Sequence, residues 1–301
     1  MTLGCFNEAA EQKKSGMESQ TKEPKFEVFG ILILIIEAYP LIYVLSASLS
    51  SSDAVSLGKV FLWPVEFSLD GYKHLAENSQ ILTGYKNSLI YLAVGVTINM
   101  LFTLLLAFPL SRRELPGRNL ITIFVTITMY ISGGLIPTYL LVDKLHMGDT
   151  LWGLILPSAI STSNMIIMRT YFTSTIPEEL REASFLDGCG YIKFFLKVVL
   201  PLSAPILAVI ALYYAVASWN TYFSALIYLR SSDKANLQLV LRNILLANQI
   251  SSGEASYTEG AKLNVTIKYA VIVAGSIPML IIYPFVQRHF TKGVMIGSIK
   301  G

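Results

Sequence analysis

The side chains best suited to binding a small polar molecule gather between positions 213 and 223, inside an apolar stretch. They combine phenol, hydroxyl, amide and aromatic groups: Tyr213, Tyr214, Ser218, Trp219, Asn220, Tyr222 and Phe223. Aromatic rings stack on the apolar C–H faces of sugars, while phenols and amides hydrogen-bond the sugar hydroxyls. This composition suits a path for a saccharide. It equally suits an aromatic belt at the outer surface of a membrane, where Trp and Tyr are enriched.

Helical spacing supports some of these candidates. Tyr214, Ser218 and Tyr222 recur every four positions, so they would share one face of a helix. Asn220 points elsewhere on such a helix and is a candidate because of its amide alone. We expect these four side chains to be the contacts along the path.

A carboxylate also stands inside an apolar stretch, because Glu37 lies three residues before Pro40 near the start of the chain. A charge near the middle of a membrane helix costs about 2.5–3.5 kcal/mol on insertion scales. Glu37 therefore needs a partner, water or a proton. It could lie on a substrate or ion path, or it could face another helix or the membrane interface, and the second arrangement is favoured.

The elements that would position these residues are apolar stretches long enough to cross a bilayer. Of 301 residues, 53% are hydrophobic and only 14% are charged, with a mean hydropathy of +0.56. A membrane helix needs about 20 mostly apolar residues. Stretches of this kind occupy residues 29–49, 88–110, 120–142, 151–171, 204–229 and 269–286. The fold class predicted is an all-α polytopic membrane protein with six transmembrane helices.

The distribution of Lys and Arg predicts the orientation, since cytoplasmic loops carry an excess of both. The segments 1–27, 111–118, 169–200 and 287–301 hold 14 of these residues in 82 positions. The segments 51–87, 143–150 and 229–268 hold 9 in 85 positions. We therefore expect both termini in the cytoplasm, a cytoplasmic tail at 1–27, a membrane domain at 28–301, and extracellular loops at about 50–87 and 229–268.

The cytoplasmic segment between the fourth and fifth stretches predicts two short helices joined at a glycine. Thr175 can cap the first helix, with Glu178 completing a capping box. Gly188 ends that helix, because glycine readily adopts the left-handed turn found at helix C-termini. The second helix covers about 191–199 and is predicted to end at Leu200-Pro201.

The same segment carries a spaced motif: Glu182-Ala183-Ser184, then Asp187-Gly188-Cys189 and, twelve residues after the glycine, Leu200-Pro201. It resembles the EAA loop of ABC importer permeases, whose pattern is E-A-A, two residues, D-G-A and a distal L-P. Small Ser184 and Cys189 replace two of the alanines. The resemblance implies that a loop at about 175–201 couples the chain to a cytoplasmic ATPase. The residues implied are Glu182, Ala183, Ser184, Asp187, Gly188, Leu200 and Pro201.

Further segments extend the resemblance over roughly residues 28–301. They are the stretch at 62–69, the basic turn at 111–118, and segments at 226–229, 237–242 and 287–293. The last three are similar to the LplC/YtcP-type branch of carbohydrate permeases, which is associated with oligosaccharide import. The resemblance implies a multi-pass subunit of the cytoplasmic (plasma) membrane. Its implied partners are a second homologous permease subunit, two ATPase subunits that bind ATP and Mg, an extracellular solute-binding protein, a saccharide and membrane lipid.

Other chemistry is poorly supported by the sequence. No G-x-x-x-x-G-K-[ST] motif occurs, so we expect no ATP site, no cofactor and no enzymatic activity in this chain itself. The three histidines lie in separate loops, which disfavours a metal site. A net charge of +3 spread over several loops gives no reason to expect nucleic acid as a partner.

The alternative to an ABC importer subunit is a self-contained, ion-coupled secondary transporter. Such transporters carry acidic or basic groups inside the membrane and internal repeats. Glu37 meets the first condition, but we find no convincing repeat.

Overall fold

The computed structural model describes residues 24–254 and 259–297, and nearly all of this part is helical. Residues 24–27 of the predicted tail form the first turn of α2 (Pro24–Ser48), the first described helix, whose apolar span begins at Val28. Positions 1–23 of that tail lie outside the described residues. Within the described ranges the extended backbone pairs at one isolated antiparallel bridge, between Ser50 and Phe67.

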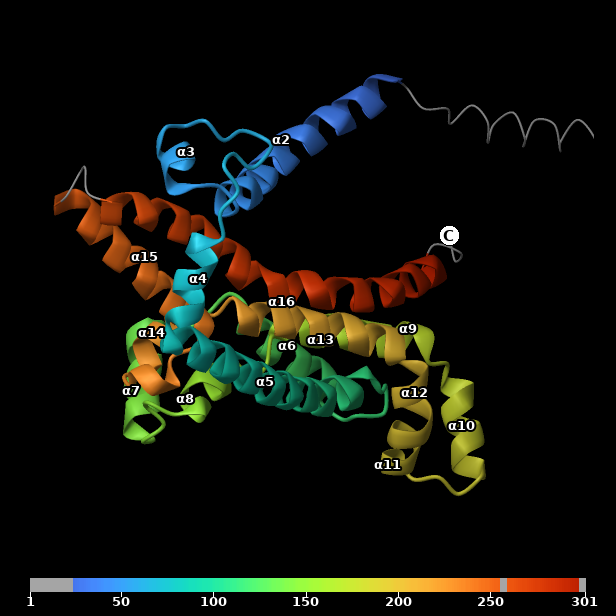
Figure 1. Cartoon of the computed structure of the whole chain (residues 1–301). Coiled ribbons are helices and arrows are strands. Elements are labelled where there is room, and N and C mark those ends of the chain that lie inside the picture. The colour runs from blue at the N-terminus through green and yellow to red at the C-terminus, as the bar shows by residue number, and fades with distance from the viewer. Residues whose placement is uncertain (1–23, 255–258, 298–301) are drawn as a thin grey trace, which may run out of the picture.

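Three described helices are long and apolar enough to cross a bilayer. The apolar spans are Val28–Ser48 of α2, Ser79–Ser111, which is the whole of α5, and Val265–Pro284 of α16 (Glu259–Gly297). Helix α2 packs against α16, where the rings of Tyr43 and Tyr269 meet edge to face with centroids 5.7 Å apart. Figure 1 shows α5 in the middle of the molecule, with α16 along one side.

Two further candidate spans are bent. The first consists of α8 (Leu151–Ile155) with η1 (Leu156–Ser158), followed by α9 (Thr162–Thr175) at an angle of 55°. The second consists of Tyr191–Leu202 and then α13 (Ala204–Trp219), at 81°. Counting each bent pair as one crossing gives up to five candidate spans among the described residues.

The predicted third stretch, 120–142, is not one helix. Helix α6 (Arg118–Ile127) ends early, and α7 (Leu135–Lys144) begins only after a gap. The gap contains adjacent glycines, Gly133 and Gly134, and Gly134 has a φ of +84°. Glycine gives up the most conformational freedom on entering a helix, so the pair favours a break here. None of the residues of α6 is buried.

The predicted extracellular loops are largely helical. Residues 50–87 contain α3 (Ser52–Ser56), α4 (Asp70–Glu77) and the start of α5. Residues 229–268 contain η3 (Ser232–Lys234), α15 (Leu237–Glu254) and the start of α16. The predicted fifth stretch, 204–229, is also divided, because α13 ends at Trp219 and α14 (Phe223–Tyr228) follows separately.

Helix α5 organises the packing, since α9, α13 and α15 all contact it. One buried cluster joins α13 and α15 to α16 around Trp219, Leu237 and Val271. A second cluster joins α5, α9 and α13 around Met165, Phe172 and Ile210. The molecule thus has two packed ends, and the two candidate sites lie at these ends.

Candidate functional site

The loop predicted to couple to an ATPase projects from one end of the molecule, as α10 (Glu178–Leu186) followed by α11 (Tyr191–Phe194) (Figure 1). Gly188 lies between them with a φ of +75°, which confirms the predicted left-handed turn. The amide of Gly188 donates to the carbonyl of Phe185, and that of Cys189 donates to the carbonyl of Ser184. A side chain at position 188 would meet no neighbour but would strain the backbone.

The structure corrects the predicted start of the first helix and the predicted end of the second. Thr175 is the last residue of α9 and does not cap α10, which begins at Glu178 after extended Pro177 with no side-chain cap. Leu200 and Pro201 do not end the second helix either, because α12 (Leu200–Leu202) continues it. A π-helical turn, η2 (Phe195–Val199), comes just before. Proline has no amide hydrogen to donate, so the widened turn accommodates Pro201 within the helical run.

A carboxylate outside the loop fastens its two helices. Glu114 lies in the turn between α5 and α6, and its two oxygens contact different helices. Oε1 is 2.5 Å from Nη2 of Arg181 on α10, and Oε2 accepts from the hydroxyl of Tyr191 on α11 at 2.5 Å. Arg181 also pairs with Glu178. The helices of the loop are therefore held to the body by one acidic residue of the basic turn.

Arg112, in the same turn, also contacts the loop and is buried, with an exposed fraction of only 6%. We call the contacts of Arg112 and Glu114 with α10 and α11 the joint. It donates to the hydroxyl of Ser111 at 3.0 Å and to the carbonyl of Phe172 at 3.3 Å. Its Nη1 lies 4.0 Å from Oε2 of Glu178. Burial lowers the pKa of Arg112, and the charge of Glu178 opposes that shift. Arg112 thus links α5, α9 and α10.

The outer side of the loop, in contrast, carries exposed side chains. Glu182 is exposed and has no hydrogen bond or ion pair within the described residues, and Ala183, Asp187 and Pro201 are exposed as well. Ser184 and Leu200 are half-buried. Two large apolar side chains point outward, since Leu186 is 89% exposed and Ile192 is 77% exposed. Acidic and apolar groups together form a surface suited to a partner.

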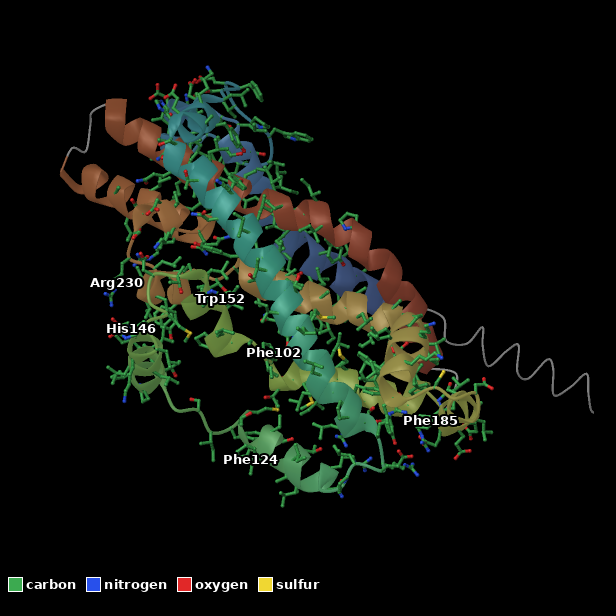
Figure 2. The ribbon with its side chains drawn as sticks, turned by 90° about the horizontal axis from the view of Figure 1, so that it is seen from below. Phe102, Phe124, His146, Trp152, Phe185 and Arg230 are labelled. Atoms are coloured by element: carbon green, nitrogen blue, oxygen red, sulfur yellow. The ribbon has the colours of Figure 1, made fainter. Side chains whose placement is uncertain are left out.

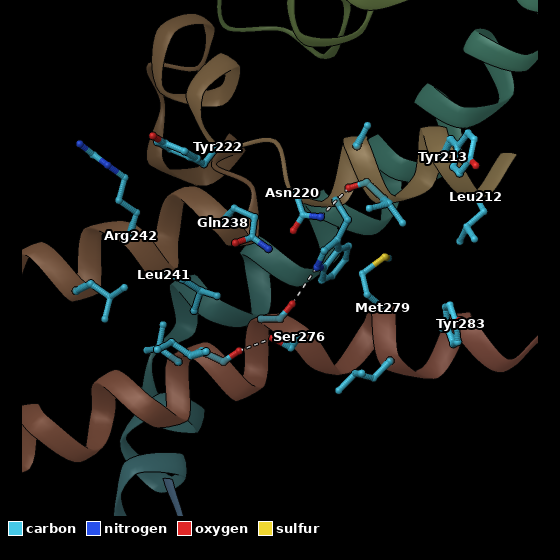
Figure 3. A pocket seen from close by; sticks show the side chains of 18 residues that line it. Leu212, Tyr213, Asn220, Tyr222, Gln238, Leu241, Arg242, Ser276, Met279 and Tyr283 are labelled. Atoms are coloured by element: carbon cyan, nitrogen blue, oxygen red, sulfur yellow. Dashed lines mark hydrogen bonds between the residues drawn. The ribbon is translucent and has the colours of Figure 1, made fainter. Parts of the chain in front are cut away.

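The candidate path residues lie near a cavity of about 1100 Å³ at the other end of α13, between α13, α15 and α16 (Figure 3). Its walls are mostly apolar, with a few polar groups. The lining residues are Leu212, Tyr213, Val216, Ala217, Trp219, Asn220, Tyr222, Gln238, Leu241, Arg242, Leu245, Val271, Ile272, Gly275, Ser276, Met279, Leu280 and Tyr283. Small-molecule sites usually measure about 300–1,000 Å³ and have this mixed character.

Of the four predicted path residues, Asn220 and Tyr222 line this cavity. Tyr214 and Ser218 are not among its lining residues. The common helical face predicted for positions 214, 218 and 222 is wrong, because α13 ends at Trp219 and Tyr222 lies beyond it. Tyr214 is only 4% exposed. Its hydroxyl lies 2.6 Å from that of Thr103 on α5 and accepts from the amide of Ser161 at 3.0 Å.

The cavity wall is fixed by a few hydrogen bonds. Nε1 of Trp219 donates to the carbonyl of Gly275 at 2.9 Å, which ties α13 to α16. The amide nitrogen of Asn220 donates to the carbonyl of Val216 at 2.9 Å. Gln238 and Arg242 extend from α15, and their side chains have no hydrogen bond or ion pair within the described part of the chain. The sequence analysis did not single out Gln238 or Arg242. Their polar side chains within the apolar run 237–247 could have indicated them as candidate binding residues.

A second carboxylate fastens the loops beyond the cavity. Asp149 accepts from the amides of Arg230 and Ser231, at 2.9 and 3.0 Å. It also accepts from the hydroxyl of Ser231 at 2.6 Å and from Nζ of Lys234 at 2.8 Å. These bonds, that of Lys234 first, hold the pKa of Asp149 well below its usual value. Figure 2 shows Arg230 beside this loop, near His146.

Glu37 and the possible metal ligands noted in the sequence do not contribute to these sites. Glu37 is exposed on α2 and is not among the residues lining the cavity. Among the described residues, no group of three or more His, Cys, Asp and Glu side chains is placed to hold a metal ion.

Comparison with known proteins identifies the class to which these features belong. The family described as "Binding-protein-dependent transport system inner membrane component" matches residues 90–296, from within α5 almost to the end of α16. The chain belongs to this family, whose members are ABC permease subunits of the membrane. Such subunits work with a second permease, ATPases that hydrolyse ATP, and a binding protein.

Individual relatives agree with this assignment. The chain is 40% identical to the polygalacturonan/rhamnogalacturonan transport system permease protein YtcP of Bacillus subtilis (strain 168), over 91% of this chain and 97% of the relative. It is 39% identical to protein LplC of the same organism, over 92% and 95%. A crystal structure of a bacterial ABC transporter involved in the import of the acidic polysaccharide alginate has a similar chain. That similarity has a TM-score of 0.79, with 31% identity over 90% of this chain and 99% of the other.

Proposed function

We propose that this chain is one of two homologous permease subunits that together enclose the import path for an oligosaccharide. The single observation that carries the proposal is the cavity between α13, α15 and α16, with aromatic and amide groups in an apolar wall. One relative is named for polygalacturonan/rhamnogalacturonan transport, and the similar solved structure belongs to an importer of alginate. Family membership also removes the reason for considering a self-contained secondary transporter.

The energy for import comes from two cytoplasmic ATPase subunits, which bind ATP and Mg and contact the loop at about 175–201. The proposed contacts are Glu182, Ala183, Ser184, Asp187, Gly188, Leu200 and Pro201. The support is that Glu182 has no ion pair within the described residues and that Leu186 and Ile192 of the same loop are exposed. Shifting a transporter between two conformations from a ratio of 1:99 to 99:1 needs about 5.5 kcal/mol of differential interaction. The contact between the loop and the ATPase must therefore be rigid enough to transmit that free energy.

The coupling role is tested by purifying the complete importer with Gly188→Val or Glu182→Ala. Valine at a φ of +75° distorts the turn, and loss of Glu182 removes the charge offered to the partner. We expect weaker ATPase binding, or hydrolysis without uptake, with normal membrane insertion. Gly190→Val is the matched control, because Gly190 has an ordinary φ of −78° and open space around it. Normal assembly and coupled transport in both variants would remove the loop from the mechanism.

The path is tested at the two predicted residues that line the cavity. Asn220→Ala and Tyr222→Ala remove the amide and the ring proposed to bind the sugar. We expect lower apparent affinity for the oligosaccharide in a stably assembled complex. Tyr130→Ala serves as a control, since Tyr130 is 83% exposed and does not line the cavity. Unchanged affinity and rate in both path variants would contradict the assignment.

The proposed arrangement in the membrane has six crossings, both termini in the cytoplasm, and the 229–268 segment facing the extracellular binding protein. The bias of Lys and Arg supports it. Single cysteines at positions 253 and 300, probed with a reagent that does not cross membranes, test it. We expect labelling at 253 and none at 300 in intact cells, and the reverse pattern would overturn the orientation.

A further inference from the structure

Arg242 is the one charged side chain among the residues that line the cavity. It is half-buried on α15, and the described residues offer it neither a hydrogen bond nor an ion pair. The described arginines of the joint, Arg112 and Arg181, each contact a carboxylate. Arg242 therefore stands out as a charge without a counter-charge in the wall of a binding-sized space.

A half-buried arginine whose donors meet no acceptor in the described part of the chain keeps those donors available to a ligand. A guanidinium offers a flat fork of N–H donors that matches a carboxylate in two parallel hydrogen bonds. The natural occupant beside Arg242 is thus an anion, and a planar carboxylate fits it best.

The neighbours of Arg242 indicate what carries that carboxylate. Figure 3 shows Arg242 and Tyr222 on the same side of the cavity, with the guanidinium extending toward its edge, while Gln238 and Asn220 lie farther in. Tyr222 is 45% exposed, so its ring can be approached. A ring for stacking and two amides for hydroxyls suit a sugar, and the arginine adds a site for an acid group.

We propose that Arg242 binds the carboxylate of a uronic acid residue in the cavity, so that the importer selects acidic over neutral oligosaccharides. The proposal rests on the proposed function and deepens it, since it names the charge class of the substrate and the residue that recognises it. A chain of sugars that each carry a carboxylate would offer Arg242 successive partners as it moves through the cavity.

The test uses the complete importer with its binding protein, reconstituted in vesicles, and two probes of equal length. The first is a galacturonate trimer, and the second is its fully methyl-esterified form, which has the same sugars without charge. For Arg242→Gln we expect ATP-dependent uptake of the acidic trimer to fall roughly 10- to 100-fold, as loss of a charged hydrogen bond predicts. Uptake of the ester should change less than about twofold. Lys59→Gln, which removes an exposed cation outside the cavity, should leave both unchanged.

Arg242→Lys supplies a second measurement that does not depend on the assembly of Arg242→Gln. It keeps the charge but loses the fork, so we expect a smaller loss confined to the acidic trimer. Equal loss with both probes would overturn the proposal and place Arg242 against an acidic residue of the second permease subunit. No loss with either probe would also overturn it.

The wild-type importer separates this inference from the proposed function. Uptake of the ester but not of the acidic trimer would refute the charge selection and leave oligosaccharide import intact. ATP-dependent uptake of neither probe, and of no other oligosaccharide, would refute both.

Discussion

The two ends of this permease are held by acidic residues with several partners, whereas the cavity near one of these ends contains a basic residue with none in the described part of the chain. Glu114 joins Arg181 and Tyr191 at the end that carries α10 and α11. Asp149 gathers four donors at the opposite end. Arg242 lines the cavity unpaired.

This difference separates structural charges from a charge available to a ligand. A carboxylate that accepts hydrogen bonds from several segments holds the backbones around it together. An unpaired guanidinium does not fix its surroundings and retains its full capacity to bind. The distinction can be tested by removing groups from each region and asking whether the effect depends on the substrate.

The largest expected effect is on the cavity wall itself. Trp219 is only 2% exposed and ties α13 to Gly275 of α16. Trp219→Ala leaves a hole and breaks this tie, so we expect a loss of about 3–5 kcal/mol of unfolding free energy. Thermal unfolding of the purified complex measures it. Trp63→Ala is the control, because Trp63 is 80% exposed, and equal effects of the two substitutions would contradict the packing described.

The next effect concerns Tyr214, which lies buried between α5, α9 and α13. Tyr214→Phe leaves the amide of Ser161 and the hydroxyl of Thr103 without their partner, at a cost of about 1–2 kcal/mol. We expect lower thermal stability with the same apparent affinity for every sugar tested. A selective change in affinity for one sugar would show that Tyr214 contacts the substrate after all.

A smaller, local effect is expected where Glu114 contacts α10 and α11. Glu114→Gln removes the charge that holds Arg181 and weakens the bond from Tyr191. The pairs are partly exposed, so global stability should change little. We expect amide hydrogens of α10 to exchange several-fold faster and more ATP to be hydrolysed per sugar imported. Exchange confined to other helices would show that Glu114 does not seat the loop.

The smallest effect at neutral pH belongs to Asp149, whose loop is already at the surface. Because its folded pKa lies below the ordinary 3.8, the stabilisation is present above about pH 4 and is lost as the pH falls further. Amide exchange across residues 226–236 should therefore be constant from pH 8 to 5, after correction for the intrinsic rate. Asp149→Asn should speed exchange and abolish the change below pH 4. Asparagine tolerates the φ of +54° at this position, so the substitution isolates the charge.

Several features could be predicted from the sequence because neighbouring residues specify them. The apolar runs that became α2, α5 and α16 indicate a membrane protein by length alone. Gly188 turns where its own lack of a side chain permits a positive φ. The spaced motif at 182–201 and the segments around it identified the family, since they require only the order of residues along the chain.

Other features depended on groups far apart in the chain. The end of α13 at Trp219 moved Tyr222 off the predicted helical face, and the hydroxyl of Tyr214 found partners on α5 and at the start of α9. Local spacing does not contain such contacts.

The same holds for the two charges that define the comparison. Glu114 contacts Arg181 and Tyr191, which are 67 and 77 positions away along the chain, because α10 and α11 fold back onto its turn. Arg242 became a ligand-binding candidate because it lines a cavity between α13, α15 and α16, and none of the other residues that line this cavity is a carboxylate. The sequence by itself determined the long apolar runs, the turn at Gly188 and the family to which the chain belongs. Only the tertiary structure decided which charges are satisfied, because that depends on what the packing brings within a few ångströms.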